Sequence, residues 1–91
     1  MTTMYNPASP GELLREFLGK TTVTELACRI GVARATVSRI LNGRTAMTVD
    51  LSIRLGQALG LTPDFFSKAQ LQYDMWNELQ KKRPKIKRLA A

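Results

Sequence analysis

One stretch of this chain, LACRIGVARATVSRILNG at residues 26 to 43, constrains the fold more than any other. Just before it, Thr22 and Glu25 have the spacing of a capping box, in which two residues satisfy otherwise unpaired amide groups at a helix start. Apolar residues then recur at the spacing of a half-buried helix, at Leu26, Ala27 and Ile30. Gly31 follows, and glycine enters the left-handed conformation at a helix end without a steric penalty at Cβ. The pattern predicts a short helix that begins after residue 22 and ends in a tight corner.

A second short helix is expected directly after this corner, over residues 34–41. At 100° per residue, one of its sides consists of Thr36, Val37, Ile40 and Leu41. The opposite side has nothing apolar to bury and consists of Arg34, Ala35, Ser38 and Arg39. Such a side suits the major groove of DNA, because arginine bonds bidentately to guanine, serine bonds several bases and alanine contacts a thymine methyl. These four residues are therefore the candidate base-reading residues.

The two helices resemble the helix-turn-helix of the lambda-repressor-like, or XRE-type, family through an L-A-x-x-x-G-V core and an R-x-L-N-G close. In that family the second helix reads bases, and the preceding helix start and the following loop bind phosphates. The resemblance implies phosphate contacts by Thr22, Val23, Thr24, Asn42 and Arg44. We expect Thr36 to help set the register on phosphates as well. One departure is Ala33, where a serine or threonine cap is common, and it weakens the second helix start by about 1 kcal/mol.

The composition fits one small domain in a reducing compartment. A chain of 91 residues buries about 60 to 65% of its unfolded surface on folding. The lone Cys28 cannot form an intramolecular disulfide, and it is expected to be a small core or edge residue. No run approaches the roughly 20 apolar residues needed to cross a bilayer, and no signal peptide precedes the fold. We therefore expect a cytoplasmic protein with no membrane contact.

The net charge of +7 is concentrated in two places. Six of the fourteen Lys and Arg residues lie between Lys81 and Arg88, and the rest of the chain is close to neutral. Within that rest, four arginines occur between Glu25 and Asp50 without an intervening acid, at Arg29, Arg34, Arg39 and Arg44. Both basic regions can meet phosphate, although a solubilising, disordered end is an equal alternative for the tail.

Two further helices are expected to flank the central pair. Residues 1–8 are expected to form an extended or disordered arm. After it, Ser9 should cap a helix with Pro10 in its first turn, and Glu12 should complete a second capping box. This helix ends at Gly19 and turns its apolar residues inward, namely Leu13, Leu14, Phe17 and Leu18. Farther along, a helix capped by Thr48 extends over residues 49–59 and closes at a glycine.

The last helix is longer than a compact five-helix domain requires. It is expected to be capped by Thr62 and to run from Pro63 to about Lys82, with a basic tail over residues 83–91. The helix-turn-helix domain would then span residues 9–82, with the central pair at 22–42. Late aromatic and apolar residues on this helix form a candidate dimer or partner interface at Tyr73, Trp76 and Leu79. The alternative is that the helix folds back along the first helix and buries this stripe as ordinary core.

Three segments sharpen the resemblance to HigA-type, or VapI-type, antitoxins. They are the opening S-P-G-E-L-L-R-E-F-L, the run G-R-T-A-M-T-V-D-L-S-I-R-L-G-Q-A-L-G and the segment F-F-S-K-A-Q-L-Q-Y-D-M-W. The resemblance covers residues 9–78, with Ser9 in place of the usual histidine. It implies a repressor whose last helix contributes to dimer formation, and which also neutralises a RelE-like ribonuclease toxin.

The sequence therefore predicts an all-α, five-helix lambda-repressor-like domain with an extended C-terminal helix, and no enzyme. It has no histidine, its carboxylates are scattered, and no cluster of metal-binding or cofactor-binding residues occurs. The predicted function is sequence-specific binding of double-stranded DNA, as a homodimer on a pseudo-palindromic operator. The alternative is an interaction module of the same fold that binds protein or RNA without reading DNA sequence.

Overall fold

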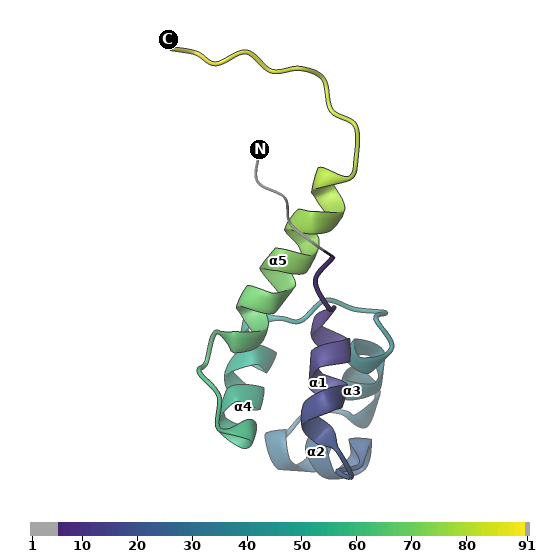
Figure 1. Ribbon diagram of the computed structural model, residues 1–91. Coiled ribbons are helices and arrows are strands. Elements are labelled where there is room, and N and C mark those ends of the chain that lie inside the picture. The colour runs from purple at the N-terminus through teal and green to yellow at the C-terminus, as the bar shows by residue number, and fades with distance from the viewer. Residues whose placement is uncertain (1–5, 91) are drawn as a thin grey trace.

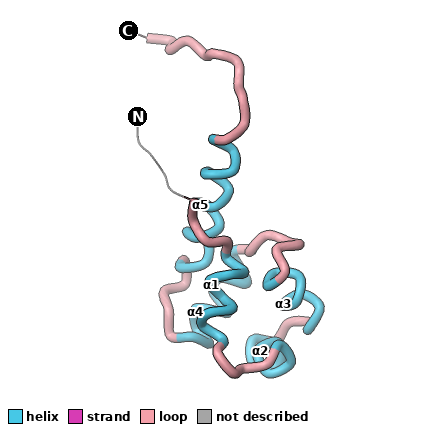
Figure 2. The backbone as a smooth tube through the Cα atoms, turned by 45° about the vertical axis from the view of Figure 1, so that its right-hand side comes forward, coloured by secondary structure: helices cyan, strands magenta, loops and turns pink. Residues whose placement is uncertain are grey.

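The computed structural model describes residues 6–90, and every regular element within them is a helix (Figures 1 and 2). The helices are α1 (Pro10–Leu18), α2 (Val23–Ile30), α3 (Arg34–Leu41), α4 (Val49–Leu59) and α5 (Phe65–Leu79). This confirms the predicted five-helix, all-α fold. The proposed arm at residues 1–8 falls largely on residues 1–5, outside the described part. None of the described helices combines the length and the apolar character that crossing a membrane requires.

The starts of the first four helices agree with the predicted cap residues. Ser9 and Thr22 each accept a hydrogen bond from the amide three residues later, and Glu12 and Glu25 accept from the two cap amides in return. Both capping boxes are thus confirmed. The Thr48 hydroxyl accepts from the Leu51 amide at 3.2 Å and starts α4. Helix α3 begins at Ala33 with no side-chain cap, as the sequence predicts.

The core lies where α1, α2, α3, α4 and the first turn of α5 meet. Its most deeply buried apolar side chains are Leu14, Val37, Ile40, Leu55 and Phe66, each no more than 2% exposed. Phe17 was expected to face inward, but it is 43% exposed and packs with its ring edge-to-face against Phe65 and Phe66. It covers the rim of the core and is not part of its centre. Cys28 is exposed, because it lies on the side of α2 opposite the buried Leu26 and Ile30.

Helix α1 fixes the C-terminal end of α3 through two close contacts. Gly11 is buried, and a Cβ at this position would overlap the carbonyl oxygen of Ile40, so the two backbones meet directly. One turn later, the Arg15 guanidinium donates a hydrogen bond to the Leu41 carbonyl at 3.1 Å. A cation at a helix C-terminus satisfies a carbonyl that the helix itself leaves unpaired. The position of α3 is therefore determined by α1 as well as by α2.

The bounds of α5 differ from the prediction at both ends. The helix begins at Phe65, after a turn at residues 63–64, and it ends at Leu79 instead of about Lys82. Asp64 occupies the cap position without a capping side-chain bond, so the predicted Thr62 cap is wrong. The start of α5 is held by Ser52 of α4, which is fully buried. Its hydroxyl donates to the Pro63 carbonyl at 2.7 Å and accepts from the Ser67 amide at 3.0 Å.

Replacing Ser52 with alanine is expected to lower the free energy of unfolding by about 1 to 3 kcal/mol. The change leaves the Ser67 amide and the Pro63 carbonyl, both in part-buried hydrogen bonds, without their partner, which costs about that much. Chemical denaturation measures the difference. Ser67→Ala is the matched control, because it removes a hydroxyl but keeps the Ser67 amide, and it should cost clearly less. Equal losses for the two variants would contradict the capping role of Ser52.

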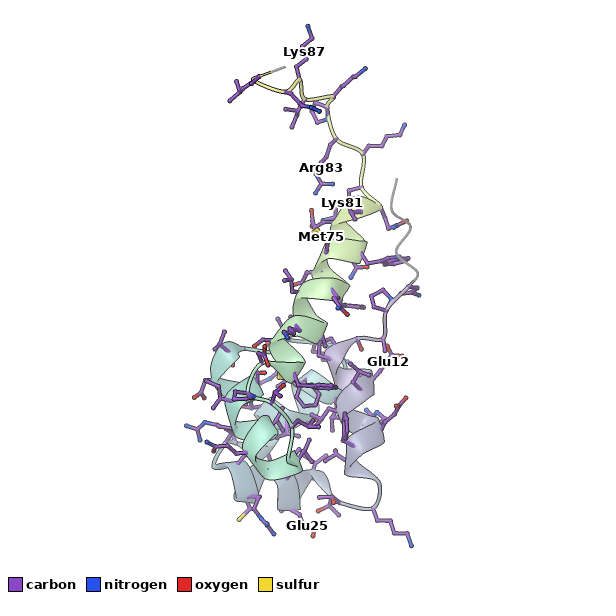
Figure 3. The ribbon with its side chains drawn as sticks, turned by 60° about the vertical axis from the view of Figure 1, so that its left-hand side comes forward. Glu12, Glu25, Met75, Lys81, Arg83 and Lys87 are labelled. Carbon is purple, nitrogen blue, oxygen red and sulfur yellow. The ribbon has the colours of Figure 1, made fainter. Side chains whose placement is uncertain are left out.

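Helix α5 extends beyond the other four helices and leads into an extended tail (Figure 1). The described molecule is accordingly elongated, with principal extents of 53 × 22 × 20 Å. Lys81 and Arg83 both form ion pairs with Glu78, at 2.8 and 2.7 Å, and hydrogen bonding to Lys81 is the main cause that lowers the pKa of the Glu78 carboxyl. These contacts hold the first residues of the tail against the end of α5 (Figure 3).

Candidate nucleic-acid interface

The corner between α2 and α3 is rigidly braced. Gly31 adopts the left-handed conformation at φ 74° and its amide donates to the Ala27 carbonyl at 2.9 Å. From α4, Arg54 donates to the Ile30 carbonyl at 2.7 Å while Asp50 holds the same guanidinium at 2.9 Å. The last turn of α2 is thereby tied to α4, and α3 leaves the corner in a fixed direction.

Helix α3 presents the predicted polar side to solvent. Val37, Ile40 and Leu41 are buried. The four candidate base-reading residues lie on the other side, where Arg34, Ala35 and Arg39 are exposed and Ser38 is half-buried. Thr36 is also half-buried and lies at the edge of the buried side, about 90° around the helix from the centre of that side.

Three arginines on this surface form no ion pair within the described residues. Arg34 and Arg39 stand on α3 and Arg44 follows in the next loop, and all three are exposed. By contrast, Arg15, Arg54 and Arg83 are each bonded to protein carbonyls or carboxylates, as described above. Cations that the fold does not use are available to an external anion.

A hollow of about 390 Å³ lies beside α3 and is lined by Val23, Arg34, Ala35 and Ser38. Val23 is the first residue of α2, half-buried and packed on one side against the core. The sequence assigned Val23 to phosphate binding at the helix start and did not predict its side chain beside the base-reading residues. The structure thus joins an apolar residue of α2 to three of the four candidates on α3, and Arg39 lies outside this hollow.

The candidate phosphate-binding residues divide into engaged and available groups. The Thr22 hydroxyl is engaged in the capping box with Glu25. The side-chain amide of Asn42 donates to the Ser38 carbonyl at 2.9 Å and to the Ser38 hydroxyl at 3.4 Å. The Asn42 side chain thereby caps the C-terminal end of α3. The exposed Thr24 side chain and the Arg44 guanidinium form no hydrogen bond within the described residues. Backbone amides at the start of α2 and the Arg44 side chain are therefore the better placed groups for anions.

The loop that carries Arg44 is anchored to α5, which the sequence did not predict. The Arg44 amide donates to the Arg39 carbonyl at 2.8 Å. Met47 is buried, and its amide donates to the Gln70 side chain at 2.8 Å, while Gln70 donates in turn to Asp74 at 2.9 Å. Met47 and Gln70 are 23 positions apart in the chain, so their hydrogen bond depends on where α5 packs and leaves no local signal in the sequence.

The three candidate interface residues on α5 lie on two different sides of the helix. Tyr73 and Trp76 are half-buried and continue the side that Phe66 turns to the core, whereas Leu79 is 60% exposed. The steps of four residues between Leu71, Met75 and Leu79 place these three on one stripe. Leu71 is 62% exposed and Met75 47% exposed, and the picture shows Met75 on the projecting part of the helix (Figure 3). We call Leu71, Met75 and Leu79 the α5 stripe.

These features define the class of protein. Two short helices joined at a glycine corner, with the second one exposed and carrying unpaired arginines, form a helix-turn-helix of the kind that places its second helix in the DNA major groove. A helix-turn-helix family model matches residues 12–66, from α1 to the start of α5.

Similarity to known proteins identifies the family within this class. It is 41% identical to the antitoxin HigA-1 of Vibrio cholerae over 78 residues, which cover 82% of this chain and 73% of that protein. The solved structure of a HigA-family antidote protein from Coxiella burnetii matches with a TM-score of 0.80 at 35% identity, covering 84% of this chain and 86% of that chain. The antitoxin GraA, solved in complex with its operator, matches with a TM-score of 0.80 at 31% identity, covering 100% and 99% of the two chains. The chain belongs to the HigA antitoxin family of helix-turn-helix proteins.

Proposed function

We propose that this protein is a HigA-like antitoxin that represses transcription by binding an operator as a homodimer in the cytoplasm. The observation that carries the proposal is the exposed side of α3, with two arginines that no residue of the described fold neutralises. The likeness to GraA in complex with its operator supports it, because that likeness extends over the whole chain. The alternative, an interaction module that does not read DNA, is not favoured by these relatives.

In this proposal the two groups of residues have separate tasks. Arg34, Ala35, Ser38 and Arg39 contact base edges and determine which sequence is bound. Phosphates are held by the amides of Val23 and Thr24 at the start of α2 and by the Arg44 side chain, with smaller contributions from Thr22, Thr36 and Asn42. Phosphate contacts set the register of α3 in the groove but carry no sequence information.

Comparing Arg39→Ala with Arg44→Ala tests this division. Arg39→Ala is expected to weaken binding to the operator by about 1 to 3 kcal/mol for each half-site and leave binding to random DNA nearly unchanged, because each protomer loses one bidentate base contact. Arg44→Ala should weaken both by a similar factor and make the salt dependence less steep, because one phosphate contact is lost. Fluorescence anisotropy at several salt concentrations measures both. If each variant lost the same factor on operator and random DNA, the assignment of roles would be wrong.

We propose that α5 forms the homodimer, with the α5 stripe at its centre and Tyr73 and Trp76 at its edge. The stripe carries three large apolar side chains that the monomer leaves exposed. A dimer of this kind would present two copies of α3 to half-sites about 34 Å apart, one turn of DNA. Two-fold symmetry of the protein then requires a pseudo-palindromic operator.

Replacing Leu71 and Met75 with glutamate is expected to convert the dimer to a monomer at micromolar concentration, because two charges would be buried in an apolar contact. Sedimentation equilibrium measures the mass. The control is Gln57→Glu with Ala58→Glu, which adds the same charge at two exposed positions of α4. A double variant on α5 that remained a dimer would place the interface elsewhere on the molecule.

The second activity in the proposal is neutralisation of a toxin, which we expect to be a RelE-like ribonuclease. The support is the similarity to HigA-1, which is named an antitoxin. This is a binding function, and it requires no catalytic residue and no cofactor in this chain.

A further inference from the structure

The hollow beside α3 has walls of two kinds. Val23 and Ala35 contribute aliphatic groups from two different helices, whereas Arg34 and Ser38 contribute a guanidinium and a hydroxyl. Val23 is half-buried against the core, so its position is fixed by packing, and Ala35 is exposed beside it. The surface that faces DNA in the proposed function thus contains a hollow with aliphatic and polar lining groups side by side.

Among the groups that bases present in the major groove, the only apolar one is the C5 methyl of thymine. Cytosine has only a hydrogen atom at C5, and adenine and guanine present donors and acceptors at that edge with no methyl group. The aliphatic groups that line the hollow therefore have one matching partner on unmodified DNA. Arg34, on the same rim, is suited to guanine O6 and N7.

Ser38 adds a polar contact to the apolar one. The side-chain amide of Asn42 donates a hydrogen bond to the hydroxyl oxygen of Ser38 at 3.4 Å. With this lone pair occupied, the hydroxyl hydrogen remains available for an acceptor. Thymine presents O4 as an acceptor next to its methyl group, whereas cytosine presents an amino donor at the same place. Val23 and Ser38 together therefore match the methyl group and the O4 of thymine, which are on neighbouring ring carbons.

We propose that the hollow formed by Val23, Arg34, Ala35 and Ser38 receives the C5 methyl of one thymine in each operator half-site, beside the base read by Arg34. Val23 is then a specificity-determining residue of α2, in addition to any phosphate contact by its amide. This inference rests on the proposed function, because it requires α3 to enter the major groove.

Substitution of thymine by deoxyuridine tests the inference, because it removes only the methyl group. The probe is the DNA duplex that the wild-type protein enriches most strongly from a random pool, and each thymine of a half-site is replaced in turn. One position per half-site is expected to lower the affinity about 4-fold, the equivalent of about 0.8 kcal/mol for one buried methyl group. Replacement at this position in both half-sites should lower the affinity about 15-fold. Replacement of the other thymines should leave the affinity unchanged.

Val23 variants show whether the hollow is the cause. Val23→Ala should reduce the preference for thymine over deoxyuridine at that position to nearly 1-fold, and Val23→Thr, which keeps the shape of the side chain, should reduce it in part. Thermal unfolding of each variant verifies the fold, and Val49→Ala, at an exposed valine of α4, is the matched control. Tight binding to the probe without any deoxyuridine-sensitive position, or with a sensitivity that the Val23 variants leave unchanged, would overturn the inference alone. Absence of any enriched duplex would overturn the proposed function together with it.

Discussion

Replacing both Arg34 and Arg39 with alanine is expected to lower the affinity of each protomer for its operator half-site by about 30-fold to 25,000-fold. Each bidentate contact between arginine and guanine contributes about 1 to 3 kcal/mol of discrimination, and the double variant loses two of them in each protomer. Neither guanidinium has a partner within the described fold, so their removal leaves no buried group unsatisfied. Binding at one fixed salt concentration measures the loss, because protein–DNA affinity depends steeply on salt.

The matched control for this variant is Lys85→Ala with Lys87→Ala in the tail. It removes an equal number of positive charges from exposed side chains of the tail, which extends away from α3 (Figure 1). We expect a small, sequence-independent loss of affinity, because only long-range attraction to phosphates is reduced. If the tail variant reduced operator binding as much as the α3 variant, net charge would explain the binding and base reading by α3 would not.

Replacing Phe66 with alanine is expected to lower the free energy of unfolding by about 3 to 5 kcal/mol. The side chain is fully buried at the point where α1, α4 and α5 meet, and its removal leaves a cavity in addition to the lost transfer free energy. A domain of this size has only about 5 to 15 kcal/mol in total. Denaturation by urea measures the change.

Phe17→Ala provides the control for Phe66→Ala, because Phe17 packs against the same two rings but is 43% exposed. Its loss should cost clearly less, since solvent or nearby side chains can fill the space at the rim. Equal costs at the two positions would show that Phe66 is not the centre of the core.

The sequence predicted α2, the corner and α3 well because each depends on residues close together in the chain. The capping box of Thr22 and Glu25, the left-handed Gly31 and the apolar sides of both helices all appear in the structure as expected. The exposed side of α3 was predicted for the same reason, since helical periodicity alone decides which residues it can bury.

What the sequence did not predict depends on contacts between distant segments. The start of α5 is held by Ser52 from another helix, so no capping signal precedes Phe65. The exposure of Leu71 and Met75 depends on the angle at which α5 leaves the core. Likewise, Val23 reaches the hollow beside Ala35 only because the corner folds α2 against α3. The periodicity of apolar residues along one helix contains no information on how that helix packs against distant segments, so it could not predict these three features.

Selection of bound duplexes from a random DNA pool, with the wild-type protein and with the Arg34→Ala, Arg39→Ala double variant in parallel, tests the central claim most directly. The account predicts that the wild-type protein enriches a pseudo-palindromic motif with half-sites about one turn of DNA apart. It also predicts that the double variant does not enrich this motif. An absence of any enriched motif with the wild-type protein, or the same motif with both proteins, would contradict sequence-specific reading by α3.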